Sequence, residues 1–306
     1  MTSEITLFVN PTAGRGRGAR AARPAATALR AAGFRVRTLV GATPADALRR
    51  AREAVRGGTG ALVVVGGDGM TGLALQAVAG TDTPLGVVAV GTGNDFARTL
   101  GLPLRDPTAA ARLVADALKQ GRTPAVDLGR AGDRWFGTVL ASGFDSRVND
   151  RGNRMRLPLG RFTYDLALLA ELAAFRPLPY RLTLDRGPVL ELEATLVAVG
   201  NGTSYGGGMR ICAGADPTDG LLDVTVVGDC TRTTLLRVFP RVYRGTHLDH
   251  PKVTVHRAAR VELAAPAVTG YADGEPLGPL PLTVTCVPGA VRVAGARPAR
   301  PAAAAG

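Results

Sequence analysis

Lysine is nearly absent from this chain, and aromatic residues are scarce. Lys119 and Lys252 are its only lysines, so arginine supplies almost all of the positive charge behind a net charge of +12 in 306 residues. Aromatic residues make up 5% of the chain, with a single tryptophan. Nucleic-acid binding requires a recognised module or aromatic platforms in addition to positive charge. The sequence shows neither, so we expect no nucleic-acid partner.

Long hydrophobic runs are missing as well. No apolar run approaches the roughly 20 residues that a membrane-spanning helix needs, and the start MTSEITLFVN has no basic stretch ahead of an apolar one. We therefore expect a cytoplasmic protein without a membrane span. The positive charge favours anionic partners, such as a nucleotide or an acidic membrane surface.

Cysteine occurs three times, as Cys212, Cys230 and Cys286. The number is odd, and the wide spacing does not match that of metal ligands. These residues are therefore expected to be small buried thiols in a reducing compartment.

One stretch, residues 61–98, organises the chain. Its two short β-branched runs, 61–65 and 85–90, are typical of buried strands in a parallel sheet. The turn GGDG follows the first strand and GTGND the second, and a helical pattern follows each turn. Ligands of open α/β sheets bind beyond the carboxyl ends of the strands, where helix N-termini offer free N–H groups to phosphate. Asp68 and Asp95 would share that crevice, which suits a nucleotide with a divalent cation, although a single GGDG is also ordinary turn chemistry.

Repeated strand–helix units predict a parallel α/β domain over residues 1–123. The elements expected around the central stretch are a strand at 4–9, a glycine-rich basic loop at 10–18, a helix at 19–32, a strand at 34–40, and helices at 43–56 and 106–120. Thr43 followed by Pro44 has the pattern of a helix N-cap and first helical position.

Short strands separated by turns predict a second, antiparallel domain over residues 124–296. The strands are expected near 125–130, 134–141, 180–185, 189–199 and 221–228, with a helical crossover at 231–245. The fold class is therefore α/β plus mainly β, with an antiparallel sandwich or barrel as the second domain. Residues 297–306 form a low-complexity tail that we expect to be disordered.

Arginines cluster ahead of an apolar helical stretch at 162–175 in the second domain. They are Arg147, Arg151, Arg154, Arg156 and Arg161. Two interpretations remain open. The stretch could be a core helix preceded by solvent-exposed arginines, or the segment could form a surface that contacts anionic lipid head groups.

Two acidic turns offer further chemistry. Asp216 and Asp219 could supply oxygen ligands to Mg²⁺, and Glu275 lies at a tip between two strands, where it could act as a general base. As a single turn, the Asp216–Asp219 segment is more often structural, and ordinary turn chemistry accounts equally well for the turn with Glu275.

The motifs, taken in order, resemble the diacylglycerol kinase catalytic family, which also contains sphingosine kinases and bacterial lipid kinases. They are NPTAGRGRG, GGDG, GTGNDFAR, VDLG, GFD, NGTSYGGGM, DGLLDV and DGEP. The resemblance extends from about residue 4 to residue 293. It implies a nucleotide-binding α/β domain, a C-terminal β-sandwich domain and an active site between them.

The resemblance also implies roles for individual residues. Glu275 would be the catalytic base and Asp68 a second catalytic residue. Asp216, Asp219 and the backbone of Leu221 would hold Mg²⁺, with Asp68, Asp95 and Asp127 tied to that network. The ATP site would comprise Asn10, Pro11, Thr12, Ala13, Gly14, Thr43, Gly66, Gly67, Asp68, Gly69, Met70, Thr71, Gly72, Thr92, Asn94 and Asp95.

The implied reaction moves the γ-phosphoryl group of ATP, with Mg²⁺, to the hydroxyl of a membrane lipid, with diacylglycerol as the first expectation. The enzyme would act at the inner face of the cell membrane, and a homodimer is compatible with the sequence. Two alternatives remain open. Met70 stands where the family usually has a hydroxyl residue, which is compatible with a relative that binds lipid or nucleotide without turnover. NAD kinases also share a GGDG and a β-rich C-terminal half.

Overall fold

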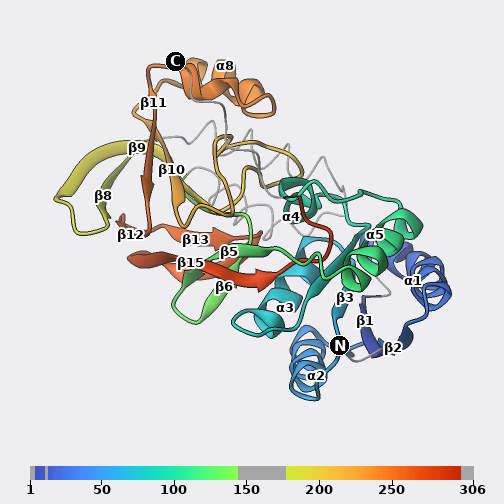
Figure 1. Ribbon diagram of the computed structural model, residues 1–306. Coiled ribbons are helices and arrows are strands. Elements are labelled where there is room, and N and C mark those ends of the chain that lie inside the picture. The colour runs from blue at the N-terminus through green and yellow to red at the C-terminus, as the bar shows by residue number, and fades with distance from the viewer. Residues whose placement is uncertain (1–3, 11–12, 144–176, 298–306) are drawn as a thin grey trace.

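The computed structural model describes residues 4–10, 13–143 and 177–297. An α/β domain and a β domain lie side by side (Figure 1). The predicted arginine cluster, the apolar stretch at 162–175 and the tail from residue 298 lie outside the described residues. Among the helices that are described, none has the length and apolar character needed to cross a membrane.

The first domain is a four-stranded parallel sheet, β2-β1-β3-β4, with helices on both faces. Helices α2 and α3 pack on one face, and α1 and α5 on the other (Figure 1). Its elements in order are β1 Glu4–Val9, α1 Ala13–Ala31, β2 Arg35–Leu39, α2 Pro44–Arg56, β3 Leu62–Gly66, α3 Asp68–Val78, β4 Leu85–Ala89, α4 Asp95–Thr99 and α5 Pro107–Lys119.

Local sequence accounts for most of this domain. Every residue of β3 and β4 is buried, as expected of central strands covered on both faces. The Thr43 hydroxyl caps α2 by accepting from the Asp46 N–H at 3.1 Å, and Asp106 caps α5 in the same way at 2.9 Å. The predicted strands and these two helices are confirmed.

The N-terminal glycine-rich segment differs from the prediction. Helix α1 begins at Ala13, so most of the predicted loop at 10–18 is helical. Glycine costs a helix about 1 kcal/mol relative to alanine. Burial of Ala21, Ala25 and Leu29 against the sheet offsets that cost. The loop between β1 and α1 is therefore shorter than expected.

In the described residues, the second domain forms one continuous antiparallel sheet of eleven strands that curves around a hydrophobic core. Most of the strands follow the path β14-β13-β7-β9-β8-β12-β15-β5-β6, and β10 joins β11 to β9. Its elements are β5 Ala125–Ala131, β6 Arg134–Phe136, β7 Val139–Gly143, β8 Leu178–Leu184, β9 Val189–Gly200, β10 Leu222–Gly228, α8 Arg232–Val242, η1 Thr246–Asp249, β11 Val253–Ala258, β12 Arg260–Ala264, β13 Thr269–Ala272, β14 Glu275–Pro279 and β15 Leu282–Arg292.

Two non-local contacts modify the predicted layout. The strand expected at 134–141 is broken at Gly137, where a Cβ would lie 2.4 Å from the Phe96 ring of α4. After β15 the chain returns to the first domain, where the Ala294 N–H donates to the Leu85 carbonyl at 2.9 Å and Val293 is buried in the core. The end of the second domain therefore completes the sheet edge of the first.

The three cysteines are free and buried, as predicted.

Candidate active site

Two cavities meet where the domains face each other. The larger, about 670 Å³, is called the glycine-lined cavity because Gly67, Gly69, Gly72 and Gly91 contribute to its wall. The smaller, about 320 Å³, is called the acidic cavity because three aspartates, Asp68, Asp95 and Asp273, contribute to its wall. Thr92 and Asp273 line both cavities. The two cavities therefore adjoin at these two residues.

Glycine allows the turns after β3 and β4 to touch. A Cβ on Gly91 would lie 2.4 Å from the Gly67 Cα, which is closer than real atoms approach. A Cβ on Gly93 would lie 2.5 Å from an Asp68 carboxylate oxygen. The bare backbone of these turns is therefore what lets Asp68 reach across from one loop to the next.

Asp68 locks the two turns together. Its carboxylate accepts from the backbone N–H groups of Asn94 and Asp95, each at 2.7 Å. Burial, together with the neighbouring Asp95 charge, raises the pKa of Asp68 above its ordinary value. Asp95 continues the chain of contacts into the second domain, because it accepts from the Gly207 N–H at 2.7 Å.

Asp273 holds the opposite wall. It has a left-handed backbone, φ 51°, and its carboxylate accepts from the N–H groups of Gly137 at 2.8 Å and Thr138 at 2.9 Å and from the Thr138 hydroxyl at 2.5 Å. Burial raises the pKa of this carboxyl. The sequence interpretation missed Asp273, although it lies in the DGEP motif, because its partners are more than 130 residues away.

Glu275 begins β14 and lines the glycine-lined cavity. Its side chain is exposed and makes no hydrogen bond or ion pair with any residue that the structure describes. The carboxylate is therefore open to a ligand, which is compatible with the predicted role as a base.

The predicted nucleotide residues divide into two groups. The first lines the glycine-lined cavity and consists of Asn10, Gly67, Gly69, Met70, Gly72 and Thr92. The second group does not line this cavity but holds neighbouring turns and helix ends in place through hydrogen bonds. Thr43 caps α2, the Thr71 hydroxyl donates to the Gly67 carbonyl at 3.2 Å, and the Asn94 side chain bonds both backbone groups of Gly91.

Five predicted nucleotide positions remain, and the structure describes three of them. Gly66 ends β3, and Ala13 and Gly14 lie in the first turn of α1. Pro11 and Thr12 lie outside the described residues. Sequence reasoning also missed Trp135, Gln76 and Leu48, which line the same cavity from other elements.

The predicted magnesium loop lies away from both cavities. Asp216 accepts from the N–H and hydroxyl of Thr218, and Asp219 accepts from the Leu221 N–H at 2.9 Å. Asp127 reaches the loop by accepting from the Gly220 N–H at 2.7 Å. Among the described residues, no hydrogen bond or ion pair joins Asp68 or Asp95 to this loop, so the predicted single network is divided into two groups.

Arg257 contacts one of the predicted magnesium ligands. Its guanidinium forms an ion pair with Asp219 and a second with Asp223, where Nε lies 3.3 Å from Oδ1. In the described parts of the chain, no three His, Cys, Asp or Glu side chains are grouped to hold a metal ion. The assignment of Asp216, Asp219 and Leu221 to Mg²⁺ therefore stays a prediction, and here the Asp219 carboxylate pairs with Arg257.

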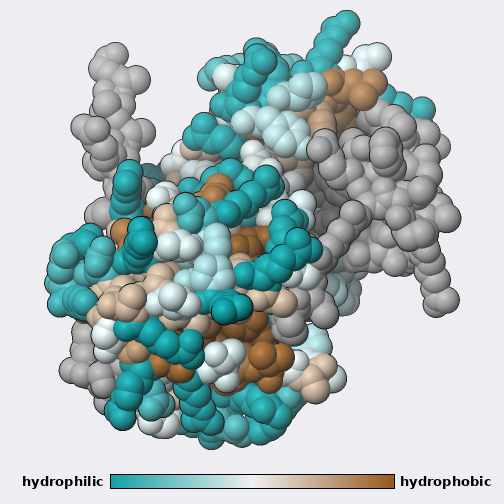
Figure 2. Space-filling model, turned by 90° about the vertical axis from the view of Figure 1, so that its right-hand side faces the viewer, coloured by the Kyte–Doolittle hydropathy of each residue, from teal (hydrophilic) through white to brown (hydrophobic). Residues whose placement is uncertain are grey.

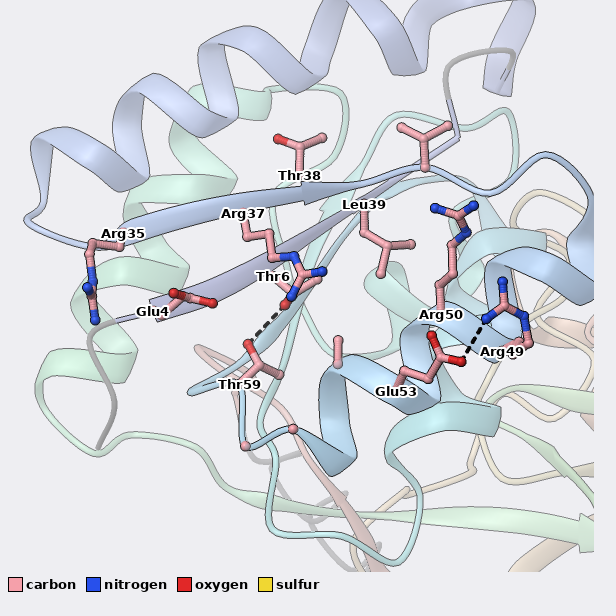
Figure 3. A pocket seen from close by; sticks show the side chains of 14 residues that line it. Glu4, Thr6, Arg35, Arg37, Thr38, Leu39, Arg49, Arg50, Glu53 and Thr59 are labelled. Carbon is pink, nitrogen blue, oxygen red and sulfur yellow. Dashed lines mark hydrogen bonds and ion pairs between the residues drawn. The ribbon is translucent and has the colours of Figure 1, made fainter.

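A third cavity, about 550 Å³, lies at the edge of the parallel sheet, between β2 and α2 (Figure 3). Arg35 and Arg37 of β2 line one side. On the α2 side, Arg49 is paired with Glu53 at 2.7 Å and Arg50 with Asp46 at 2.9 Å. It contains none of the residues predicted to carry the chemistry.

Comparison with known proteins identifies the family. Residues 4–131 match the diacylglycerol kinase catalytic domain, and residues 138–295 match the YegS C-terminal NAD kinase beta sandwich-like domain. The chain is 46% identical over 295 residues to a diacylglycerol kinase of Mycobacterium tuberculosis, covering 95% of this chain and 94% of the relative. This chain belongs to the diacylglycerol kinase family. It is a lipid kinase, a phosphotransferase, and its family implies the use of ATP.

Other relatives agree with this assignment. A diacylglycerol kinase of Bacillus subtilis is 27% identical over 90% of both chains. A solved diacylglycerol kinase structure from Bacillus anthracis has a TM-score of 0.73 at 24% identity, covering 97% of each chain. An NAD kinase of Archaeoglobus fulgidus, solved with ATP, has a TM-score of 0.52 at 14% identity, covering 96% of this chain and 93% of the other. Both structural likenesses concern the fold alone.

Proposed function

We propose that this member of the diacylglycerol kinase family transfers the γ-phosphoryl group of ATP to the free hydroxyl of a diacylglycerol, giving phosphatidic acid. The observation that carries the proposal is the junction of the two cavities at Thr92 and Asp273. Phosphoryl transfer needs donor and acceptor in line within one enclosed space, and the junction offers such a space.

The glycine-lined cavity suits ATP. Its glycine turns allow phosphate oxygens to approach backbone N–H groups closely, and α3 begins at this wall with its N-terminus. Trp135 and Leu48 supply apolar surface for the base. Because the described carboxylates form no preformed metal cage, we propose that Mg²⁺ arrives bound to the ATP phosphates, which is its usual mode in kinases. Bound there, it would neutralise phosphate charge.

The acidic cavity suits a lipid alcohol. Asp68 and Asp95 of the first domain and Asp273 of the second line it, and much of the remaining wall is apolar, with Val139, Ala141, Tyr205, Met209 and Tyr271. An acceptor with a hydroxyl beside acyl chains matches this division, because the hydroxyl would face the carboxylates while the chains contact the apolar wall.

The chemistry follows from the charges at the junction. The acceptor oxygen forms a bond to the γ-phosphorus while the bond from that phosphorus to the ADP oxygen breaks. In a loose transition state the hydroxyl proton leaves late, so the residues mainly position the reactants. Glu275, which is exposed and unpartnered among the described residues, would accept the proton. Asp68 would fix the two glycine turns that position the phosphates.

Glu275→Gln tests this assignment. It keeps the shape and the exposed position but removes the base, so kcat should fall about 10²-fold, the usual scale of general base catalysis. Thermal stability should stay unchanged. The measurement is ADP release with Mg-ATP in mixed micelles of diacylglycerol, and in micelles without it. Glu191→Gln, on an exposed strand position, is the matched control.

Three outcomes would contradict parts of the proposal. Unchanged turnover of Glu275→Gln would remove its role as the base. ATP binding by the wild-type enzyme without ADP release from any lipid alcohol would favour a non-catalytic relative. Release that requires NAD instead of lipid would favour an NAD kinase.

A further inference from the structure

Helix α8 presents an outer face that the fold leaves uncovered. Leu235, Val238 and Val242 are buried against the β domain. On the outer side Leu236 is 54% exposed and Tyr243 is 50% exposed. Few large apolar side chains in the described residues are this exposed, and two of them lie on this one helix. Exposed apolar side chains that lie together mark an interaction surface more often than single ones do.

The same face carries arginine without acidic partners. Arg232, Arg237, Arg241 and Arg244 are all exposed, and none of their side chains has a hydrogen bond or ion pair with a described residue. No Asp or Glu occurs between residues 230 and 248. The charge of this helix is therefore available to an external anion.

The two kinds of residue form adjoining strips. At about 100° per residue, Leu236 and Tyr243 fall together, while Arg237, Arg241 and Arg244 fall on the neighbouring strip. Phe239 borders the apolar strip and packs edge-on against Tyr243, with ring centroids 6.3 Å apart. An apolar strip beside a basic strip is the pattern of a helix that lies in a membrane interface.

The position of α8 connects this face to the acceptor site. The helix lies at one extreme of the molecule (Figure 1), and hydrophobic surface is visible at the same height in Figure 2. Beneath α8 is a small apolar cavity, about 30 Å³, lined by Phe239 and by Tyr205 and Met209. Tyr205 and Met209 also line the acidic cavity. Side chains under α8 are therefore also the apolar end of the proposed lipid site.

We propose that the outer face of α8, formed by Arg232, Leu236, Arg237, Arg241, Tyr243 and Arg244, docks on an anionic lipid bilayer and brings the acceptor cavity to its substrate. The inference rests on the proposed function for the identity of that substrate. Each arginine near an anionic surface strengthens binding severalfold, and leucine and tyrosine insert at the head-group level. A second copy of the same face would meet like charge, and two exposed apolar side chains are too few for a stable dimer.

Vesicle co-sedimentation of the full chain, without nucleotide, tests the surface. We expect binding to vesicles with about one-third anionic phospholipid, weak binding to neutral vesicles, and a loss of binding as salt rises. The variant R237Q/R241Q/R244Q should reduce partitioning about 10²-fold. L236S/Y243S should reduce it on the order of tenfold, through lost insertion.

A charge-matched control separates this helix from the general positive field. R35Q/R37Q/R56Q removes the same charge from the other domain, at two exposed arginines of β2 and one at the end of α2, and should change partitioning about twofold or less. An equal loss in the two triple variants would overturn the proposal, and so would the absence of binding by the wild-type protein to anionic vesicles.

Activity measurements separate this inference from the proposed function. R237Q/R241Q/R244Q should lose turnover on long-chain diacylglycerol in anionic vesicles but keep turnover on a dispersed short-chain diacylglycerol. Equal loss on both substrates would show that α8 acts on the catalytic site and would overturn the docking role. If the wild-type protein binds anionic vesicles but phosphorylates neither substrate, the proposed function fails while the docking surface remains.

Discussion

Two groups of carboxylates in this protein have opposite electrostatic surroundings. At the domain junction, Asp68, Asp95 and Asp273 are held mainly by backbone N–H groups and a hydroxyl. Asp95 also forms one ion pair, with Arg98, whose Nε lies 3.6 Å from Oδ1, whereas no ion pair with a described residue is found for Asp68 or Asp273. In the Asp216–Asp223 loop, by contrast, Arg257 pairs with both Asp219 and Asp223.

The two groups differ in how much of their negative charge is still open to a ligand. Backbone N–H groups orient a carboxylate without neutralising it, so the junction keeps negative charge in a partly buried place. That charge can be balanced by protons, as the raised pKa values of Asp68 and Asp273 indicate, or by a cation brought with the substrate. In the loop, Arg257 already places a positive charge beside Asp219 and Asp223. Acidic residues in a motif therefore do not by themselves identify a metal site.

Asp68→Asn should have the largest effect. One carboxylate oxygen becomes an amide NH₂ that faces a backbone N–H of Asn94 or Asp95, so the link between the two glycine turns breaks and the junction loses a charge. We expect kcat for lipid phosphorylation to fall about 10³-fold, within the range seen when preorganised electrostatic groups are removed. Asp82→Asn, at a fully exposed carboxylate of the same domain, is the control. A loss below about tenfold would mean that the junction does not depend on this carboxylate.

Arg257→Gln should have an intermediate effect, on stability. It leaves the buried Asp223 and its neighbour Asp219 without their cation. Because the guanidinium is about half exposed, the free energy of unfolding should fall by about 2 kcal/mol, less than for a fully buried pair. Urea unfolding without nucleotide measures this loss.

Added Mg²⁺ tests whether the loop can bind a metal ion once Arg257 is removed. Mg²⁺ should restore part of the lost stability in Arg257→Gln but should have little effect on the wild-type protein, where Arg257 already pairs with the loop. Arg260→Gln, which removes an exposed pair with Glu262, should show neither change. Equal stabilisation of the wild-type protein by Mg²⁺ would show that the loop binds metal despite Arg257.

The smallest effect concerns pH. Burial, and to a lesser extent the Asp216 charge, raise the pKa of Asp223 from 3.8 to about 6. Between these values the native state binds more protons than the unfolded state, so stability falls as pH rises from about 4 to about 6. Screening near the exposed Arg257 limits the change to about 1–2 kcal/mol. Asp223→Asn should lack this decrease when unfolding is followed across the pH range, and an unchanged pH profile would argue against the raised pKa.

Much of the first domain could be predicted because its signals are local. The apolar runs of β3 and β4 and the caps at Thr43 and Asp106 each act within a few residues. Glycine turns at consecutive strand ends also predicted a shared crevice, since parallel strands place their carboxyl ends at one edge. The contact between Asp68 and the backbone of Asp95 confirms that these two turns lie together.

The sequence by itself determined the alternation of strands and helices, the glycine turns after β3 and β4, and the motifs that mark the family, because hydrophobic period, capping and turn chemistry are properties of neighbouring residues. Tertiary structure decided which carboxylates share a cavity. Asp273 finds its partners at Gly137 and Thr138, and Arg257 reaches back to Asp219. Such pairings depend on strand order and register, which bring distant segments together and which no local pattern encodes.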